Sequence, residues 1–390
     1  MRKWIGLGAV PGLAVLAIAV VAAETRGVSP TEIVLGTHTD LSGPAATYGV
    51  SGSNAVKMRF DEANEAGGIH GRKIRLIVED TQYQVPRAVQ AATKLINRDH
   101  IFAMVAALGT PMNNAVFKEQ FDAGVPSLFP FSAARSMYLP FHRLKFYSAA
   151  SYVDQVRAGI KYFVQEKGKK AVCAMYQDTD FGKEVLDGIQ MQVDEMKLKL
   201  VEVATHKPTD QDFTAEITKL KTAGCDLVVL GTIVRDSIVP YATARKIGWT
   251  EADFLGSAAT YDMFVAAAQG GVTEGLYAMG LTDMPYRDSL SPVAQGWFDR
   301  YKERFKVEPN IGAVYGYVSA DLTVLGLERA GSDLTLDSLI AGLESITGYH
   351  DIFNGPEQNF GPDKHQGASS SFLAVVKDGR WVRLTDPLVF

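Results

Sequence analysis

The stretch Glu62-Ala-Asn-Glu-Ala-Gly-Gly-Ile-His-Gly-Arg-Lys-Ile-Arg-Leu-Ile-Val-Glu-Asp80 decides the fold of this chain. Gly67 and Gly68 are typical of a helix end, because glycine enters the left-handed backbone region at little steric cost. His70-Gly71-Arg72 predicts a turn, and residues 73–79 predict a strand, because they alternate and are rich in Ile, Leu and Val. An apolar strand-like run and the loop Thr39-Asp-Leu-Ser-Gly-Pro-Ala-Ala-Thr-Tyr-Gly49 precede the helix. The order is therefore strand, loop, helix, turn and strand.

This alternation continues along the chain. Strand-like runs occur at 33–41, 74–79, 101–108, 126–131, 171–176, 200–204, 227–231, 254–257 and 276–281, and helix-like runs at 50–66, 87–99, 113–123, 153–167, 183–196, 213–223 and 293–305. Such repetition predicts an α/β fold with parallel sheets and helices on both faces. Because 390 residues are many for one hydrophobic core, we expect two lobes. No Gly-Ser or Pro-rich linker separates them, so we expect short crossovers at 147–151 and 275–278. Asp378-Gly379 predicts a hairpin turn within 371–384.

The first 23 residues have the three parts of an export signal. Arg2 and Lys3 are basic, residues 5–20 are apolar, and small residues end at Ala23, so we expect a signal peptide at 1–23 that is cleaved after Ala23. An uncleaved membrane anchor is the alternative, because the apolar run approaches the length of a spanning helix. The two cysteines, Cys173 and Cys225, lie in strand-like segments. We expect two buried thiols in neighbouring strands, with a disulfide as the alternative that an exported protein permits.

Several classes of function lack support in this sequence. The net charge of −5 gives no basic excess for nucleic acid. The phosphate-binding glycine motifs and the G-x-S-x-G elbow are absent, and no two histidines have the spacing of a helical zinc pair. Asp178-Thr-Asp-Phe-Gly182 has the start of a calcium loop without its later glutamate. We therefore expect no catalytic residue, no metal and no cofactor.

Four loops follow predicted strands and are the expected place of a ligand: residues 40–49, 108–114, 129–136 and 176–182. In open α/β sheets, ligands bind beyond the carboxyl ends of the strands, often at helix N-termini. Thr110 precedes Pro111, and proline suits the first turn of a helix. The free amides of that turn would attract an anion.

The Leu-Ser-Gly-Pro loop, the Tyr48-Gly pair and the Ala-Gly-Gly-Ile-His-Gly block together resemble one family. It is the family of periplasmic solute-binding proteins of ABC transporters for branched-chain amino acids and related small carboxylates. The resemblance covers about residues 28–384. It implies two doubly wound parallel-sheet lobes that close on a ligand by a hinge, with a third crossing near 348–353. The expected lobes are 28–148 with 278–350, and 149–277 with 351–390. It also implies a periplasmic location, membrane permease subunits as partners and a monomeric mature protein.

The resemblance also implies ligand contacts. The loops that hold the ligand carboxylate in this family match Gly109 and Thr110, and Ser132, Ala133 and Ala134. Thr110 and Ser132 could instead only cap helices. Where the amino-acid binders carry an acid for the ligand ammonium, this chain has Ala258, and Phe181 replaces a tyrosine. An unpaired buried ammonium would cost several kcal/mol, so we expect a ligand without an α-ammonium.

Aromatic residues crowd the same loops. Tyr48, Phe181 and Tyr261 are expected to contact an aromatic ligand. Phe129 is more typical of a core residue, and Phe131 could equally be a core residue or a contact. Arg235 is a candidate partner of the carboxylate, although it and Arg135 are more typical of solvated or lobe-bridging arginines. His38 could bind the ligand or a loop carbonyl, and Tyr315 and Tyr317 are weak contact candidates.

The sequence thus predicts a receptor that delivers a small carboxylate, an aromatic acid of the hydroxybenzoate or phenylpropenoate type, to an ABC importer. The alternatives are a branched-chain amino acid or keto acid, and a sensor of the same fold that serves a regulatory partner.

Overall fold

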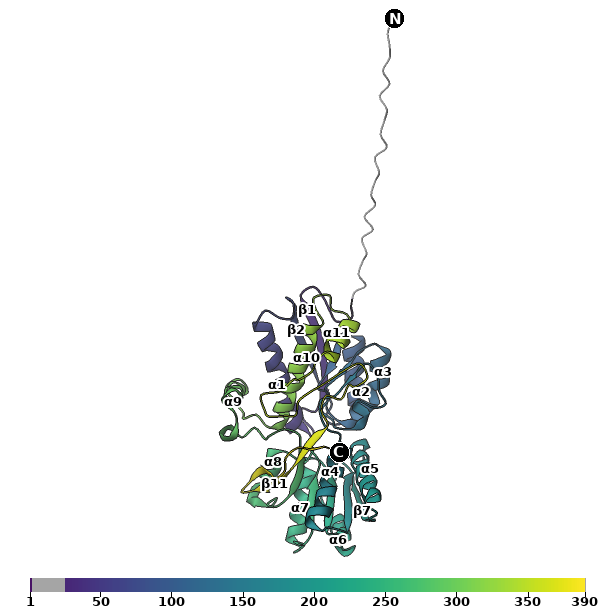
Figure 1. Cartoon of the computed structure of the whole chain (residues 1–390), viewed down its shortest axis with the longest axis vertical. Coiled ribbons are helices and arrows are strands. Elements are labelled where there is room, and N and C mark those ends of the chain that lie inside the picture. Colours follow the sequence, from purple (N-terminus) through teal and green to yellow (C-terminus); the bar gives the residue numbers. More distant parts are fainter. Residues whose placement is uncertain (2–24, 390) are drawn as a thin grey trace.

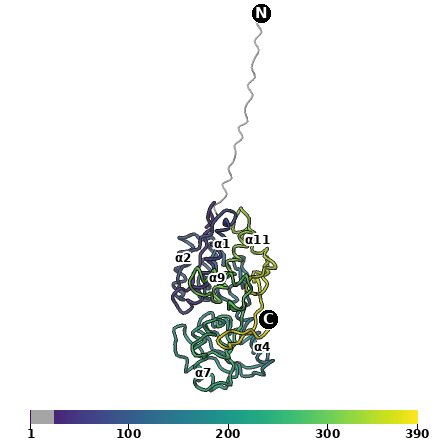
Figure 2. Tube along the Cα trace, turned by 90° about the vertical axis from the view of Figure 1, so that its left-hand side faces the viewer, coloured from purple at the N-terminus to yellow at the C-terminus, as the bar shows by residue number. Residues whose placement is uncertain are grey.

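The structure is a computed structural model that describes Met1 and residues 25–389. It forms two α/β lobes, one above the other (Figure 1). The view in Figure 2 shows the same two bodies from the side, with the yellow C-terminal strands in the lower lobe. Residues 2–23 of the predicted signal peptide, with its cleavage site at Ala23, lie outside the described residues. No helix in the described part of the chain combines the length and apolar character that crossing a membrane requires.

Lobe 1 is built on a five-stranded parallel sheet of order β2-β1-β3-β4-β5. The strands are β1 (Glu32–Thr39), β2 (Lys73–Asp80), β3 (Ala103–Val105), β4 (Ser127–Leu128) and β5 (Lys145–Phe146). Helices α1 (Ala46–Glu65), α10 (Ile311–Arg329) and α11 (Leu336–Glu344) share one core with the sheet, and α2 (Val85–Asn97) and α3 (Thr110–Asp122) share another. Helix α9 (Pro292–Phe305) lies against α1, and the Tyr301 hydroxyl donates to Ser51 O at 3.2 Å.

Lobe 2 contains an eight-stranded sheet of order β12-β11-β10-β9-β8-β6-β7, with β13 paired to β11. The parallel strands are β6 (Val172–Gln177), β7 (Leu200–His206), β8 (Leu227–Gly231), β9 (Asp253–Gly256) and β10 (Tyr277–Gly280). The antiparallel additions are β11 (Ser370–Lys377), β12 (Arg380–Arg383) and β13 (Leu388–Val389). Helices α4 (Tyr152–Lys167) and α5 (Asp180–Glu195) cover one face, and α6 (Thr214–Thr222), α7 (Val234–Lys246) and the short α8 (Met263–Ala266) cover the other.

The parallel strands of both lobes follow the same order. Numbered within each lobe, the order is 2-1-3-4-5, which is a doubly wound arrangement with a reversal between strands 1 and 3. The predicted fold class is therefore confirmed. The predicted hairpin is also confirmed, because Asp378 and Gly379 have φ of 51° and 72° and connect β11 to β12.

The lobe boundaries differ from the expected ones in two places. Strand β10 pairs with β9 and β11, so residues 278–280 lie in the sheet of lobe 2 rather than in lobe 1. The first part of the segment 351–390, up to about residue 366, packs on lobe 1, where Phe360 N donates to Ile346 O and His365 contacts Lys145 O. The third crossing therefore lies near 366–370 and not near 348–353. This segment is irregular and carries no helix or strand period, so the sequence has no signal that marks its course.

The expectation of two free thiols is wrong. Cys173 and Cys225 form a disulfide, with their Cα atoms 5.8 Å apart. Cys173 lies in β6, and Cys225 lies at the entrance of the adjacent strand β8. Their spacing falls within the range that a disulfide spans, and this spacing depends on strand pairing that the sequence does not state.

Candidate functional site

A pocket lies between the lobes, at the carboxyl ends of their strands. It encloses about 1050 Å³ of space between atoms, part of it open to solvent. The loops after β1 and β3 line it from lobe 1, with Tyr48 and Thr110, and the loops after β6 and β8 line it from lobe 2, with Phe181 and Ile233. These loops flank the reversal in strand order of each sheet, which is where doubly wound folds bind ligands.

The first turn of α3 supplies the polar end of the pocket. Gly109 has a φ of 99°, and an added Cβ would lie 2.8 Å from Met112 Sδ, so glycine is required there. Asn113 holds the loop by donating to Ala107 O at 2.9 Å and to Gly109 O at 2.8 Å. The Thr110 and Ser132 hydroxyls lie 2.7 Å apart, and both residues are buried and line the pocket. The helix amides and these hydroxyls together can receive an anion.

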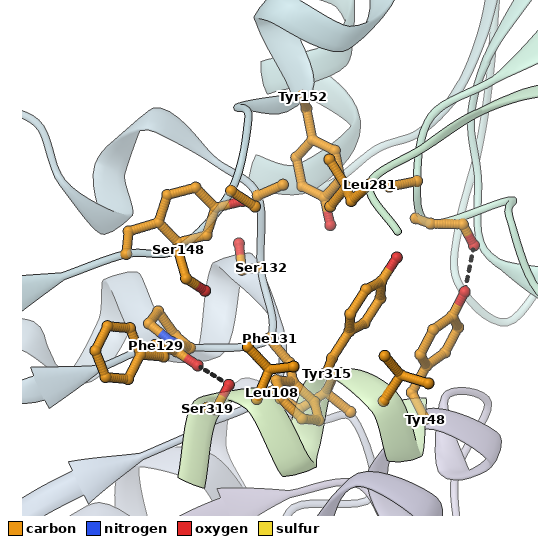
Figure 3. Close-up of a pocket in the computed structure, with 18 of the residues that line it drawn as sticks. Tyr48, Leu108, Phe129, Phe131, Ser132, Ser148, Tyr152, Leu281, Tyr315 and Ser319 are labelled. Carbon is orange, nitrogen blue, oxygen red and sulfur yellow. Dashed lines mark hydrogen bonds between the residues drawn. The ribbon is translucent and has the colours of Figure 1, made fainter. Parts of the chain in front are cut away.

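Tyrosine and phenylalanine rings form much of the remaining wall (Figure 3). The Tyr48 hydroxyl reaches across the cleft and donates to Ala259 O at 3.3 Å. The Tyr152 and Phe181 rings meet edge to face, with centroids 4.9 Å apart. Burial, then the charge of Asp262, raises the pKa of Tyr48. Burial, then the neighbouring Tyr152 and Asp262, raises the pKa of Tyr315. These phenols therefore remain neutral and can donate hydrogen bonds.

The pocket wall contains no basic side chain among the residues that the structure describes. Its one carboxylate belongs to Asp351. Asp351 Oδ1 accepts from Phe353 N at 2.7 Å and from Gly355 N at 3.0 Å. Burial raises the pKa of Asp351 in spite of these two bonds. An anionic ligand group would therefore rely on amides and hydroxyls rather than on a cation.

Seven of the ten predicted site residues line the pocket: Tyr48, Gly109, Thr110, Ser132, Ala133, Phe181 and Ala258. Three do not. Ala134 is buried in the core of lobe 2 next to a 3-10 turn. Tyr261 turns away to pack on Phe372 and Trp381.

Arg235 is the third, and its guanidinium is occupied elsewhere. It pairs with Asp236 Oδ1 at 2.7 Å and donates to Pro208 O at 2.7 Å. The expected contact of Arg235 with a ligand carboxylate is therefore not supported by the geometry, because the side chain of a first-turn residue of α7 turns back along lobe 2.

Arg135 bridges the lobes. Its Nε lies 2.9 Å from Glu184 Oε1, and its second guanidinium nitrogen lies 3.1 Å from Asp187 Oδ2. Both acids lie on α5 of lobe 2, whereas Arg135 follows β4 of lobe 1. Asn114 adds a second bridge by donating to Asp180 Oδ2 at 2.8 Å. These contacts hold the lobes together beside the pocket.

Two further candidates lie apart from the pocket wall. His38 is fully buried in β1, and neither ring nitrogen has a hydrogen-bond partner among the described residues. Burial lowers the pKa of His38 to about 4. The Tyr317 hydroxyl donates to Glu62 Oε2 of α1 at 2.6 Å, and the residue does not line the pocket.

Several lining residues were not predicted as contacts. Tyr83 follows β2, Tyr152 begins α4, Ser148 lies in the first crossover, and Asp351 and Gln358 lie in the irregular segment of lobe 1. The first crossover was expected at 147–151, so its residues could have been included as the back wall of the cleft. The described residues contain no group of three or more His, Cys, Asp or Glu side chains arranged to hold a metal ion.

Comparisons with known proteins agree with this architecture. A family model described as periplasmic binding protein matches residues 32–380. The leucine-, isoleucine-, valine-, threonine- and alanine-binding protein of Pseudomonas aeruginosa is 22% identical over 75% of this chain and 76% of its own length. A Leu/Ile/Val-binding protein homolog of Brucella suis is 24% identical over 79% of this chain and 80% of its own length.

Solved structures have the same fold. A fatty acid ABC transporter substrate-binding protein from Thermomonospora curvata superposes with a TM-score of 0.85 and 24% identity, covering 94% of both chains. A branched-chain amino acid ABC transporter protein from Thermus thermophilus with bound valine gives 0.84 and 20%, covering 92% of this chain and 97% of the other. The chain therefore belongs to the periplasmic binding protein family, and it is a binding protein rather than an enzyme.

Proposed function

We propose that the mature protein, cleaved after Ala23 and monomeric, captures an aromatic monocarboxylate in the periplasm and delivers it to the permease subunits of an ABC importer. The ligand is of the hydroxybenzoate or phenylpropenoate type. One observation carries this proposal: the pocket combines hydroxyl groups and a helix N-terminus at one end with a largely apolar, aromatic wall that contains no basic residue among those described.

The carboxylate binds at the first turn of α3. The Thr110 and Ser132 hydroxyls face each other in the pocket, 2.7 Å apart, so either can reorient to donate to an incoming oxygen. The partial positive charge of the helix N-terminus adds to this attraction. Hydrogen bonds to an ionised group are among the stronger ones, at about 1.5–3 kcal/mol each.

The ligand lacks an α-ammonium and a second carboxylate. Ala258 and its neighbour Ala259 give the lobe 2 wall no side-chain partner for an ammonium near α3. A second carboxylate would be desolvated without a cation, in a pocket that already contains Asp351. An aromatic ring suits the wall instead, because Tyr48 and Phe181 come from opposite lobes and can enclose it.

Two alternatives have specific support. The relatives named above bind branched-chain amino acids, and Asp351 could take the place of the missing acid. The Thermomonospora curvata neighbour is a fatty acid ABC transporter substrate-binding protein, and an apolar pocket also suits an alkyl chain. A branched-chain keto acid is a third alternative, because its carboxylate can bind at the same first turn of α3. A sensor of the same fold would use the same pocket with a regulatory partner.

Calorimetry with the purified mature protein tests the proposal. The panel comprises benzoate, hydroxybenzoates, cinnamate, leucine, valine, 4-methyl-2-oxopentanoate and octanoate. We expect the best aromatic acid to bind at least tenfold more tightly than leucine, a difference of about 1.4 kcal/mol. Micromolar binding of leucine or valine without binding of any aromatic acid would overturn the assignment.

Substitution of Thr110 tests the carboxylate site. Thr110→Ala should weaken every bound carboxylate about tenfold, or about 1.4 kcal/mol, because one hydroxyl donor is lost. Thr110→Ser keeps the hydroxyl and should bind nearly as well as the wild type. Equal affinities for Ala and wild type would place the carboxylate elsewhere. Small-angle scattering with and without the best ligand tests closure of the lobes.

A further inference from the structure

Tyr315 presents a hydroxyl to the pocket that has no hydrogen-bond partner in the described part of the chain. The residue belongs to α10 of lobe 1, and Figure 3 shows its ring rising from the helix with the hydroxyl directed into the cavity. The oxygen is buried, and burial raises the pKa of this phenol, so it stays a neutral donor and acceptor. Buried polar atoms are nearly always paired in native proteins, so this oxygen is a position for a ligand atom or a bound water.

The Tyr152 hydroxyl enters the same space from lobe 2. Figure 3 shows it directed downward into the cavity, opposite Tyr315. Tyr152 is the first residue of α4, and its backbone N donates to Ala133 O at 2.7 Å. Its ring is held edge to face against Phe181. Burial raises the pKa of Tyr152 to about 12, so this phenol is neutral as well.

Close helix packing holds Tyr315 in place. A Cβ at Gly316 would lie 2.3 Å from Gly52 O, and one at Gly312 would lie 3.0 Å from Tyr48 Cα. Glycines on α10 thus let it pack directly on α1, which leaves little freedom to the backbone of the turn that carries Tyr315. The site is therefore prepared before the ligand arrives.

We propose that Tyr315 and Tyr152 bind a ring hydroxyl of the ligand, which makes the preferred ligand a hydroxylated aromatic acid. This inference rests on the proposed function. A ligand hydroxyl can donate to one phenol and accept from the other, and this would give the Tyr315 hydroxyl the partner that it lacks. An anionic substituent fits poorly, because no basic residue lines the described pocket and the buried Asp262 lies near enough to act on both Tyr48 and Tyr315.

The experiment compares ligands that differ in one ring substituent, using variants that each lose one tyrosine hydroxyl. Calorimetry measures benzoate and the hydroxybenzoate isomer that the wild type binds most tightly, with the methyl ether of that isomer as a third ligand. The variants are Tyr315→Phe and Tyr152→Phe, each of which removes one oxygen. The control is Tyr317→Phe on the same helix, whose hydroxyl bonds to Glu62 outside the pocket.

We expect the wild type to bind the hydroxylated acid at least tenfold more tightly than benzoate. Tyr315→Phe should reduce this preference about tenfold and change benzoate affinity less than twofold, and Tyr152→Phe should act in the same direction. Tyr317→Phe should leave the preference unchanged. The methyl ether, which only accepts, should bind between the two acids.

Two results would overturn the inference while leaving the proposed function intact. Equal loss of benzoate and hydroxybenzoate in Tyr315→Phe would mean that the phenols hold the carboxylate. An unchanged preference would mean that Tyr315 binds only water. Failure of the proposed function is distinct, because the wild type itself would then bind no aromatic acid.

Discussion

The two walls of the cleft have the same strand order and different chemistry. Lobe 1 supplies the α3 N-terminus and the hydroxyls of Thr110, Ser132 and Tyr315. Lobe 2 supplies mainly apolar surface, including Phe181, Ile233 and Ala258, with Tyr152 as its polar exception. Two sheets of the same topology thus present different surfaces to the pocket, one mainly polar and one mainly apolar. If the proposed function holds, lobe 1 provides most of the polar contacts to the ligand, and lobe 2 covers the ligand and excludes water.

The interiors of the lobes differ as well. The one disulfide of the chain lies in lobe 2, between β6 and the entrance of β8. Lobe 1 buries the neutral His38, and lobe 2 buries the acid Asp262, whose Oδ2 has no partner among the described residues. The lobes should therefore respond differently to reduction and to pH, although one hinge joins them.

The largest expected effect is a loss of stability in lobe 2, and not in lobe 1, when the disulfide is removed. Replacing Cys173 and Cys225 together by alanine opens a loop with a sequence separation of 52. Chain-entropy estimates give a loss of about 4 kcal/mol for a loop of this size. Hydrogen exchange should show reduced protection in β6 and β8, with β1 and β3 nearly unchanged. An equal loss in both lobes would show that they unfold as one unit.

The next effect is a pH response of lobe 2. Burial raises the pKa of Asp262 from 3.8 to about 6, so the folded state prefers the protonated form. The stability that this group contributes is full below pH 3.8 and is lost as the pH rises through 6. The loss is about 3 kcal/mol. Asp262→Asn retains Oδ1, which accepts from Phe264 N at 2.8 Å, and should flatten this dependence in hydrogen exchange of lobe 2.

Lobe 1 should respond to pH in the opposite direction. Burial lowers the pKa of His38 from 6.5 to about 4, so the folded state prefers the neutral ring. Its contribution is full above pH 6.5 and is lost as the pH falls toward 4, again by about 3 kcal/mol. Exchange in β1 measured between these pH values should reveal this loss, and His38→Gln should remove it. A lobe 1 that is insensitive to pH would contradict the burial of a neutral histidine.

A smaller effect tests the covering role of lobe 2. Phe181 is 2% exposed and lines the pocket. Phe181→Ala should cost about 1–3 kcal/mol of ligand binding, on the scale of burying one large apolar side chain. The loss should appear mainly as faster ligand release in stopped-flow measurements, because lobe 2 closes over the ligand. Phe264 of lobe 2 is 51% exposed outside the pocket, so Phe264→Ala should leave binding unchanged.

The smallest effect concerns the bridge between the lobes. Arg135→Ala removes pairs with Glu184 and Asp187 that are partly exposed to solvent. Such pairs contribute about 0.2–1 kcal/mol each, so ligand affinity should fall only a few-fold, and less so at high salt. Arg143 pairs with Asp337 within lobe 1 and provides the matched control. Loss of affinity in both variants would exclude a specific role for the bridge.

Local sequence patterns predicted most of the fold. The glycines after α1, the alternating β2 and the helix ends of both lobes depend on neighbouring residues, so their signals are local. Two helices have weaker local signals than the others. Helix α10 is buried on most sides and has no polar face to create a period, and α7 carries Pro240 in its interior.

The candidate site residues could be predicted only where their position depends on which loops follow the strands of the sheet. Gly109, Thr110 and Ser132 follow strands of the sheet, and their loops meet at one edge whatever the side-chain details. Tyr261 and Arg235 also follow strands, yet they turn toward the β11–β12 hairpin and toward Asp236. The direction of a side chain depends on what packs beside it.

The α/β class and the two lobes could be predicted from the chain alone, because they depend on periodicity, glycine stops and strand order. The same holds for the position of the Gly109–Thr110 loop beside the pocket. Three features required the tertiary structure: the Cys173–Cys225 pairing, the course of residues 351–367, and the placement of Tyr315 and Tyr152 in one pocket. Each of these depends on the distance between segments far apart in the chain, and that distance is set by packing rather than by any local pattern.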